Sequence, residues 1–218
     1  MKLDPQTALS GKAALLLDFD GPVCSVFAGY PAPQIARELV ATLRGVSPGL
    51  ADVLTAETDP MEVLRIAAES LPRDRVEAVD AQLCAAETEA VETAEPTPGA
   101  AGLIDAARAA GLAVAIVSNN SAGPIAKYLK LHGLDGAVSA TVGRPFGRPD
   151  RMKPDPFLLH EALGSLGAEP TRACFVGDSV TDIEAGTTAG VMTIGYANKP
   201  GKTERLRGAG ADLVVDRL

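Results

Sequence analysis

The stretch Leu15-Leu16-Leu17-Asp18-Phe19-Asp20-Gly21-Pro22 decides the fold of this chain. An apolar run leads directly into two carboxylates, Asp18 and Asp20, spaced two residues apart. Because side chains alternate along a strand, both acids leave the same face, and Gly21 permits a sharp turn where the strand ends. Asp followed by Gly is also typical of an ordinary turn. The stretch alone leaves a catalytic pair and a structural turn as alternatives, and the rest of the chain decides between them.

The composition is that of a globular protein with room for one domain and a smaller inserted one. The chain has 218 residues, of which 46% are hydrophobic and 22% charged. Its net charge of −8 argues against nucleic-acid or anionic-lipid partners, because both bind basic patches. No apolar run has the length of a membrane span or a signal-peptide core. We therefore expect a cytoplasmic protein, a monomer or a weak homodimer, whose partner is a small molecule.

The cysteines indicate neither a disulfide framework nor a zinc site. They are three in number and far apart, and they lack the CxxC spacing of metal sites. The sequence leaves open a role for Cys24, which lies four residues after Asp20.

Residues 23–96 differ in pattern from the rest of the chain. Apolar residues recur there at helical spacing, without a strand signal. These core positions are Ile35, Leu39, Leu43 and Val46, then Met61, Leu64, Ala68 and Leu71, then Val76, Val79, Leu83, Ala86 and Ala90. We expect the acids of the last helix to be solvated, namely Glu77, Asp80, Glu87, Glu89, Glu92 and Glu95. The pattern predicts an inserted helical domain over 23–96 and a main domain formed by 1–22 and 97–218.

After the insertion, helices and strands alternate regularly. The strands are apolar on both faces, which is typical of a parallel sheet covered by helices on each side. Strands are predicted over 112–117, 137–142, 173–176, 191–194 and 212–215, and helices over 99–110, 122–132, 156–166, 181–189 and 203–207. The fold class is therefore α/β, a doubly wound parallel sheet with an inserted all-helical domain. In this architecture, ligands bind beyond the carboxyl ends of the strands.

Polar residues follow four of the predicted strands or their connections. They are Asp18 and Asp20, Ser118-Asn119-Asn120, Lys153, and Gly177-Asp178-Ser179-Val180-Thr181-Asp182. Each alone has an ordinary explanation, because Ser, Asn and Asp also cap helices and most lysines are exposed. A parallel sheet gathers all four on one edge, and this convergence favours a catalytic site. The carboxylates are hard oxygen ligands of the kind Mg²⁺ prefers, and Lys153 suits a phosphoryl group.

Through these four motifs, in this order, the chain resembles the haloacid dehalogenase-like superfamily. The insertion after the first motif resembles the helical C1-type cap of the phosphoglycolate-phosphatase and β-phosphoglucomutase branch. The resemblance spans nearly the whole chain and implies a phosphatase acting on a small phosphorylated metabolite. The metabolite itself, whether a sugar phosphate, phosphoglycolate or a nucleotide, is not readable.

The resemblance also implies a role for each motif. Asp18 would attack phosphorus to form an aspartyl-phosphate, while Asp20 would protonate the leaving oxygen and then activate water. Ser118, Asn119 and Lys153 would hold the transferring phosphoryl group. The implied Mg²⁺ ligands are Asp18, the backbone carbonyl of Asp20, and Asp178, with Asp182 supporting the site.

Two functions remain as alternatives, a phosphomutase and a receiver-like module, whereas two other chemistries of the superfamily are disfavoured. Dehalogenase-like and phosphonatase-like members lack an acid at the position of Asp20, and the latter need a cap lysine, which residues 23–96 do not contain. A phosphomutase of the β-phosphoglucomutase type would keep the same nucleophile. A receiver-like signalling module also uses acids, Mg²⁺ and lysine, but it has no inserted lobe and no acid two residues after the nucleophile.

Arginines supply the candidate contacts for the unreacting part of the substrate. Arg44 is the candidate on the cap, because it ends the first cap helix beside Gly45. Arg144, Arg148 and Arg151 form a second candidate group just before Lys153, since clustered arginines suit a carboxylate or a second phosphate. Of these three, Arg148 is the proposed substrate ligand.

Overall fold

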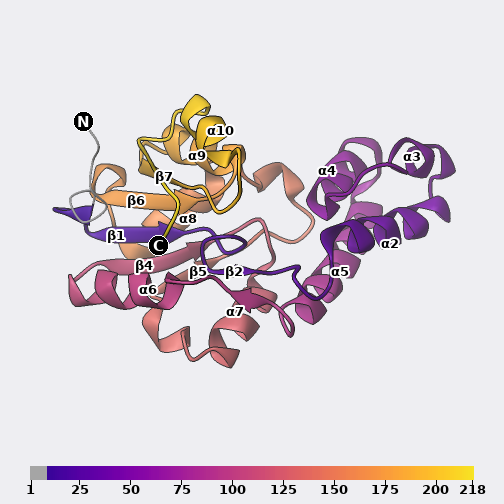
Figure 1. The fold of residues 1–218 in the computed structure, drawn as a ribbon. Coiled ribbons are helices and arrows are strands. Elements are labelled where there is room, and N and C mark those ends of the chain that lie inside the picture. Colours follow the sequence, from indigo (N-terminus) through magenta and orange to yellow (C-terminus); the bar gives the residue numbers. More distant parts are fainter. Residues whose placement is uncertain (1–8) are drawn as a thin grey trace.

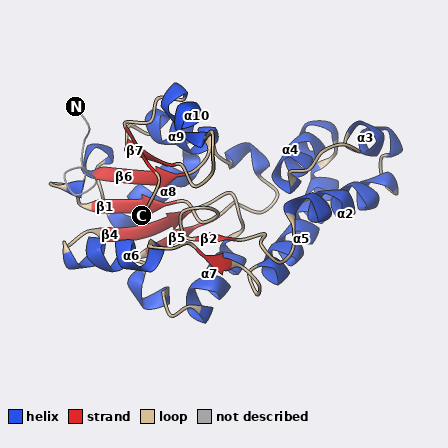
Figure 2. Ribbon diagram, in the orientation of Figure 1, coloured by secondary structure: helices blue, strands red, loops and turns tan. Residues whose placement is uncertain are grey.

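A parallel sheet with helices on both faces forms the larger of two lobes (Figure 1; Figure 2). The computed structural model describes residues 9–218. Its six strands lie in the order β5-β4-β1-β6-β7-β8. They are β1 (Ala14–Leu17), β4 (Ala113–Val117), β5 (Ala140–Val142), β6 (Ala173–Gly177), β7 (Met192–Tyr196) and β8 (Leu213–Val215). The predicted doubly wound parallel sheet is confirmed.

The helices of this sheet lobe divide between the two faces of the sheet. They are α6 (Ala100–Ala109), α7 (Ala122–Leu131), α8 (Phe157–Leu166), α9 (Val180–Thr188) and α10 (Lys202–Gly208), with 3₁₀ turns η1 (Asp135–Ala137), η2 (Pro149–Arg151) and η3 (Pro170–Arg172). Leu15 and Leu17 pack into one core with α6 and α7. Ala14 and Leu16 pack into the other with α8 and α9. Strand β1 is therefore buried on both faces, which explains its unbroken apolar run.

The central strand sets where the neighbouring strands end. Leu17 of β1 lies opposite Ile116 of β4 and Val176 of β6. All three strands are parallel, so their carboxyl ends lie at one edge of the sheet. The residues that follow these strands meet there.

Four helices form a second, helical lobe with its own apolar core (Figure 1). They are α2 (Ala32–Arg44), α3 (Pro48–Val53), α4 (Pro60–Ser70) and α5 (Arg73–Ala90). The core positions predicted for the first and last helices of this lobe are buried, with one exception. Val46 is 43% exposed, because α2 ends at Arg44 and the helical spacing does not continue beyond it. On α4 the core positions are Val63, Leu64 and Ala67, whereas Met61 is only partly buried.

A short antiparallel ribbon lies where the chain passes between the lobes. It pairs β2 (Cys24–Ser25) with β3 (Glu95–Pro96). Just beyond it, Gly29 lies so near Thr93 that an added Cβ would be 2.2 Å from the threonine Oγ1. Glycine is therefore required at this close approach of the two segments.

Among residues 9–218, no helix is both long enough and apolar enough to cross a membrane.

Candidate active site

Asp18 directly follows β1 at its carboxyl end, and the residue is only 7% exposed. One carboxylate oxygen, Oδ1, accepts a hydrogen bond from the Phe19 amide at 2.8 Å and pairs with Lys153 Nζ at 2.8 Å. Burial raises the pKa of Asp18 well above its ordinary value, and the charge of Asp182 adds to this effect. The ammonium of Lys153 acts in the opposite direction.

Lys153 is held rigidly between two acids. Its Nζ lies 2.8 Å from Asp18 Oδ1 and 2.6 Å from Asp182 Oδ1, and the residue is only 2% exposed. Asn119 fixes its backbone, because the Asn119 side chain accepts from the Lys153 amide at 2.8 Å and donates to its carbonyl at 3.2 Å. Burial lowers the pKa of Lys153, but the two carboxylates outweigh burial and raise it above its ordinary value. Lys153 is thus a fixed positive charge.

The two downstream acids lie at the start of α9, with Asp178 just before the capping residue Ser179 and Asp182 in the first turn. Ser179 caps the helix, since its Oγ accepts from the Asp182 amide at 3.2 Å and Asp182 Oδ2 accepts from the Ser179 amide at 3.0 Å. The other Asp182 oxygen remains for Lys153. The two roles weighed for this motif, helix capping and active-site charge, therefore coexist in Asp182.

Two glycines make room for these acids. Gly21 has a φ of +106°, and a Cβ there would lie 2.5 Å from Asp178 Oδ2. A Cβ on Gly177 would lie 2.3 Å from Asp182 Cβ. Any larger residue would push the carboxylates away from β1, so the close approach of the first and last motifs depends on glycine.

Carboxylate oxygens of Asp18, Asp178 and Asp182 all lie within 4.8 Å of one another. This set of hard oxygen donors fits Mg²⁺, which is commonly held by one or two carboxylates together with substrate phosphate. Asp178 also accepts hydrogen bonds from Asn198 Nδ2 at 3.0 Å and from Lys202 Nζ. The side chain of Asp20 does not belong to the cluster.

Asp20 turns away from the acid cluster toward the chain that enters the helical lobe. Its Oδ1 accepts a hydrogen bond from the Val26 amide at 2.9 Å. Burial raises its pKa to about 6, although the Val26 hydrogen bond partly offsets this. A raised pKa lets a carboxyl group hold a proton near neutral pH, as a general acid requires.

In the metal-free protein, Asp20→Asn is expected to increase the unfolding free energy by about 3 kcal/mol near pH 8. The folded pKa of about 6 exceeds the ordinary 3.8, so the folded state binds this proton more tightly than the unfolded state. At about pH 8 the carboxyl is ionised in both states, and its burial destabilises the parent; below about pH 4 both states are protonated and the difference disappears. Urea unfolding at the two pH values with chelator measures the effect. Equal stability at the higher pH would contradict it.

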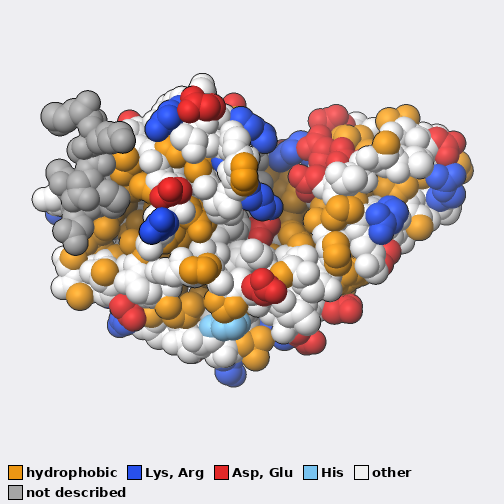
Figure 3. Space-filling view, viewed as in Figure 1, with side chains coloured by type: hydrophobic (Ala, Val, Ile, Leu, Met, Phe, Trp, Pro, Cys, Tyr) orange, Lys and Arg blue, Asp and Glu red, His pale blue; other side chains and the backbone are white. Residues whose placement is uncertain are grey.

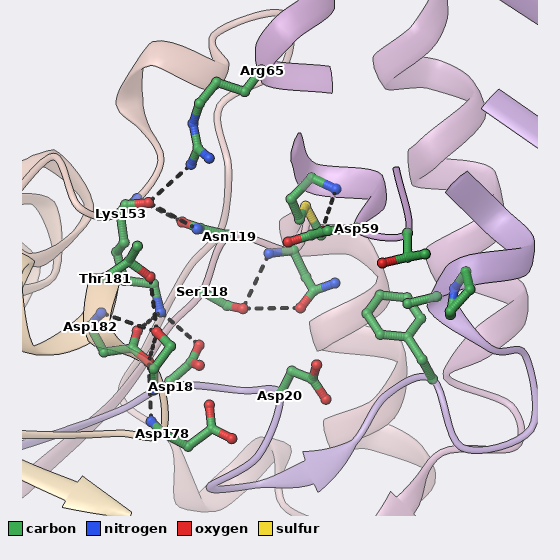
Figure 4. Close-up of a pocket in the computed structure, with 17 residues that line it drawn as sticks. Asp18, Asp20, Asp59, Arg65, Ser118, Asn119, Lys153, Asp178, Thr181 and Asp182 are labelled. Carbon is green, nitrogen blue, oxygen red and sulfur yellow. Dashed lines mark hydrogen bonds and ion pairs between the residues drawn. The ribbon is translucent and has the colours of Figure 1, made fainter. Parts of the chain in front are cut away.

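A cavity of about 420 Å³ lies over these residues, between the lobes (Figure 3; Figure 4). From the sheet lobe it is lined by Asp18, Asp20, Ser118, Asn119, Asn120, Lys153, Asp178, Ser179, Thr181 and Asp182. From the other side it is lined by Phe27, Ala32, Pro33, Thr58, Asp59, Met61 and Arg65. Arg65, on α4, reaches across and donates to the Lys153 carbonyl at 3.2 Å (Figure 4). The four motifs therefore face a pocket that the helical lobe closes on its far side.

The structure does not bring the candidate arginines into this pocket. Arg44 is exposed and pairs with Asp52 at 2.9 Å, and Arg148 pairs with Asp150 at 2.7 Å beside a different depression. Arg144 is buried rather than available to a ligand. The candidate arginines are paired with carboxylates of the protein itself, and the arginine that lines the pocket is Arg65.

Two residues that line the pocket, Asp59 and Arg65, and one that contacts Asp178, Lys202, carry no sequence signal of their own. Arg65 is one of five arginines in residues 23–96, and its spacing does not set it apart. Asp59 precedes Pro60 and caps α4 by accepting from the Met61 amide at 2.8 Å, a signal for a helix start only. Lys202 lies far along the chain from Asp178, and only the sheet order brings α10 beside it.

Comparisons with known proteins agree with this geometry. A family model described as haloacid dehalogenase-like hydrolase matches residues 12–190. The chain belongs to this family of hydrolases, as its motifs predict.

Individual relatives fall in the expected branch. A phosphoglycolate phosphatase of Rhodospirillum rubrum is 36% identical over 107 residues, covering 47% of this chain and 44% of the relative. A pyrophosphatase of Halalkalibacterium halodurans is 34% identical over 105 residues, covering 47% and 48%. The chain therefore spans less than half the length of these curated relatives.

Solved structures share the fold along nearly the whole chain. A putative phosphoglycolate phosphatase from Lactobacillus plantarum aligns with a TM-score of 0.69 at 22% identity, covering 94% of this chain and 95% of the other. A β-phosphoglucomutase from Clostridium difficile aligns with a TM-score of 0.72 at 19% identity, covering 94% and 91%. At these identities the likeness establishes the fold alone.

Proposed function

We propose that this protein is a Mg²⁺-dependent phosphatase that hydrolyses a small phosphorylated metabolite through an aspartyl-phosphate at Asp18. One observation carries the proposal. Asp18 touches the fixed ammonium of Lys153 at 2.8 Å and shares an acid cluster with Asp178 and Asp182, at the base of a pocket between two lobes. The relatives named for phosphatases support hydrolysis as the outcome.

The residues of the pocket supply a two-step reaction. In the first step a carboxylate oxygen of Asp18 forms a bond to phosphorus, the bond to the leaving oxygen breaks, and Asp20 gives that oxygen its proton. In the second step Asp20 takes a proton from water, the water oxygen bonds to phosphorus, and the bond to Asp18 breaks, which releases phosphate and restores both carboxyl groups. Lys153 and the Ser118 hydroxyl are the groups proposed to hold the phosphoryl oxygens, and both residues line the pocket.

The proposed Mg²⁺ ligands are Asp18, the backbone carbonyl of Asp20, and Asp178, with Asp182 in support. When bound, the ion supplies positive charge to the oxygens of the transferring group. The pocket needs this charge, because five carboxylates line it, those of Asp18, Asp20, Asp59, Asp178 and Asp182, against the two cations Arg65 and Lys153.

Residues 23–96 are proposed to act as a cap over the leaving group, and residues 1–22 and 97–218 as the catalytic core. The wall opposite the motifs comes from the helical lobe and includes Phe27, Asp59 and Arg65. Enzymes commonly close such a lobe over the substrate and exclude water. The apolar and polar groups of this wall would select the unreacting part of the metabolite.

Removing the metal is expected to lower the rate of phosphate release at least about 100-fold. Without the ion, the pocket would carry more carboxylates than cations and would repel a phosphate dianion. The experiment is a phosphate-release screen over a panel of phosphorylated metabolites, run with Mg²⁺ and with excess chelator. Restoring Mg²⁺ to the chelated sample is the control and should recover the rate. Full turnover in chelator would contradict the metal dependence.

The same screen separates the alternatives. Phosphate release without a bisphosphate activator favours hydrolysis over a phosphomutase reaction. A protein that only accepts a phosphoryl group from a donor, without release over minutes, would behave as a receiver-like module.

A further inference from the structure

Three charged side chains lie buried together between the lobes, outside the catalytic motifs. Arg144 follows β5, and Asp80 and Glu87 both belong to α5. All three side chains are 0% exposed. The two acids are seven residues apart, about two helical turns, so they share one face of the helix. The expectation that these acids are solvated and that Arg144 meets substrate is therefore wrong, because they pair with one another.

The guanidinium of Arg144 bridges the two carboxylates, and we call the three residues the buried triad. Its Nη2 and Nε donate to Asp80 Oδ1 at 2.7 and 3.0 Å, and its Nη1 donates to Glu87 Oε1 at 2.9 Å. The other Asp80 oxygen accepts from the Gly147 amide at 2.7 Å. The triad thus joins α5 to the segment after β5.

The triad also forms hydrogen bonds to the segment that follows β4. This segment, residues 118–121, is here called the β4 loop. Arg144 Nη1 donates to the Asn119 carbonyl at 2.5 Å. Glu87 Oε1 accepts from Asn120 Nδ2 at 3.2 Å, and its Oε2 accepts from the Ser121 amide at 3.0 Å and from the Ser121 hydroxyl at 2.6 Å. The β4 loop contributes Ser118, Asn119 and Asn120 to the pocket. A residue of the helical lobe therefore holds the phosphoryl-binding side of the site.

Stability alone is a weak reason for such a cluster. Burying two carboxylates and one guanidinium removes them from water, and buried ion networks are often no more stabilising than apolar residues of the same volume. Burial lowers the pKa of Arg144, but the carboxylates of Glu87 and Asp80 outweigh it and raise it above its ordinary value. What a fully paired network does provide is one fixed arrangement of the groups it contacts.

We infer that Glu87 and Arg144 are positioning residues that fix the β4 loop for phosphoryl transfer. The inference rests on the proposed phosphatase function. Its physical reason is that catalysis depends on placing the loop donors accurately, since a shift of about 1 Å can cost roughly 100-fold in rate. On this view the helical lobe completes the phosphoryl site as well as covering the leaving group.

The test compares variants that weaken the hydrogen bonds between the triad and the β4 loop with a matched control. Glu87→Gln keeps the shape of the side chain and removes its charge, and Arg144→Lys keeps the charge and loses the forked geometry. Glu89→Gln, an exposed acid on the same helix, is the control. A triple variant, Arg144→Met with Asp80→Leu and Glu87→Met, refills the volume without charge, so that a folded protein is available even if a single variant unfolds.

The measurements are kcat and KM for the best phosphomonoester of the screen, thermal unfolding, and calorimetric binding of inorganic phosphate in the presence of Mg²⁺. We expect kcat to fall about ten- to 100-fold in both single variants and in the folded triple variant. Phosphate should bind correspondingly more weakly, whereas Glu89→Gln should match the parent. If the buried triad only stabilised the fold, its variants would change thermal unfolding without changing kcat or phosphate binding in the folded protein.

The outcomes separate this inference from the proposed function. A parent that releases phosphate while folded triad variants keep kcat and phosphate affinity within two-fold of it overturns the positioning role alone. A parent that releases none overturns the proposed function, and phosphate binding then still tests the triad. If the parent does not bind phosphate either, both ideas fail.

Discussion

Replacing Asp18 with Asn is expected to lower turnover by on the order of 10⁴-fold or more, as the loss of a covalent nucleophile does in other enzymes. The amide nearly matches the carboxylate in shape, but it offers no charged oxygen to attack phosphorus. The protein should remain folded, because burial disfavours the charge of Asp18 and because the Lys153 ammonium keeps Asp182 as a carboxylate partner in the variant. Loss of rate would then report chemistry rather than unfolding.

Two measurements check this expectation. Steady-state phosphate release gives the change in rate, with Asp105→Asn, an exposed acid on α6, as the matched control. Mass spectrometry of acid-quenched protein should find a phosphoryl group on the peptide containing Asp18 in the parent but not in the variant. A variant that retains a rate within ten-fold of the parent would show that Asp18 is not the nucleophile.

Replacing Lys153 with Met is expected to reduce both stability and rate. Its ammonium lies between Asp18 and Asp182 in a buried site, and removing one partner of such a pair typically costs about 3–5 kcal/mol. The loss should shrink at acidic pH, because burial raises the pKa of Asp18 and this acid then becomes neutral. Turnover should fall by about 100-fold or more, because a fixed charge facing the phosphoryl group is lost.

Urea unfolding at neutral and acidic pH, together with kcat, measures both effects. Lys130→Met replaces an exposed lysine on α7 and serves as the control. If Lys153→Met destabilises the protein by less than about 1 kcal/mol at neutral pH, the buried pairing is not a native-state contact in solution.

The meeting of the four motifs at one edge of the sheet is predicted well, because its signals are local. Each motif directly follows a strand or its connection, and parallel strands bring their carboxyl ends together whatever the loops do. Asp18 and Asp178 are 160 residues apart, yet both follow strands that are neighbours in the sheet. Strand and helix positions in the sheet lobe agree with the structure to within a few residues for the same reason.

Charged residues away from the motifs are predicted poorly. Glu87 lies four residues after Leu83 and three before Ala90, so helical spacing places it beside the apolar face of α5, but an acid at such a position is usually solvated. Glu87 is nevertheless fully buried against Arg144. Helical periodicity can indicate the face of α5 on which Glu87 lies, but it does not contain the partners, Arg144 and Ser121, that the docking of the two lobes brings to it.

The position of β1 in the sheet has a consequence for how the chain folds. Ala14 of β1 pairs with Ala113 of β4 and Ala173 of β6, which lie 99 and 159 residues further along the chain. Strand β1 therefore cannot pair until those strands have been synthesised. The contacts within α2–α5 are much closer in sequence, and local contacts form faster than distant ones. During synthesis we therefore expect the helical lobe to become compact first, while Asp18 reaches its final environment only after β6 has left the ribosome.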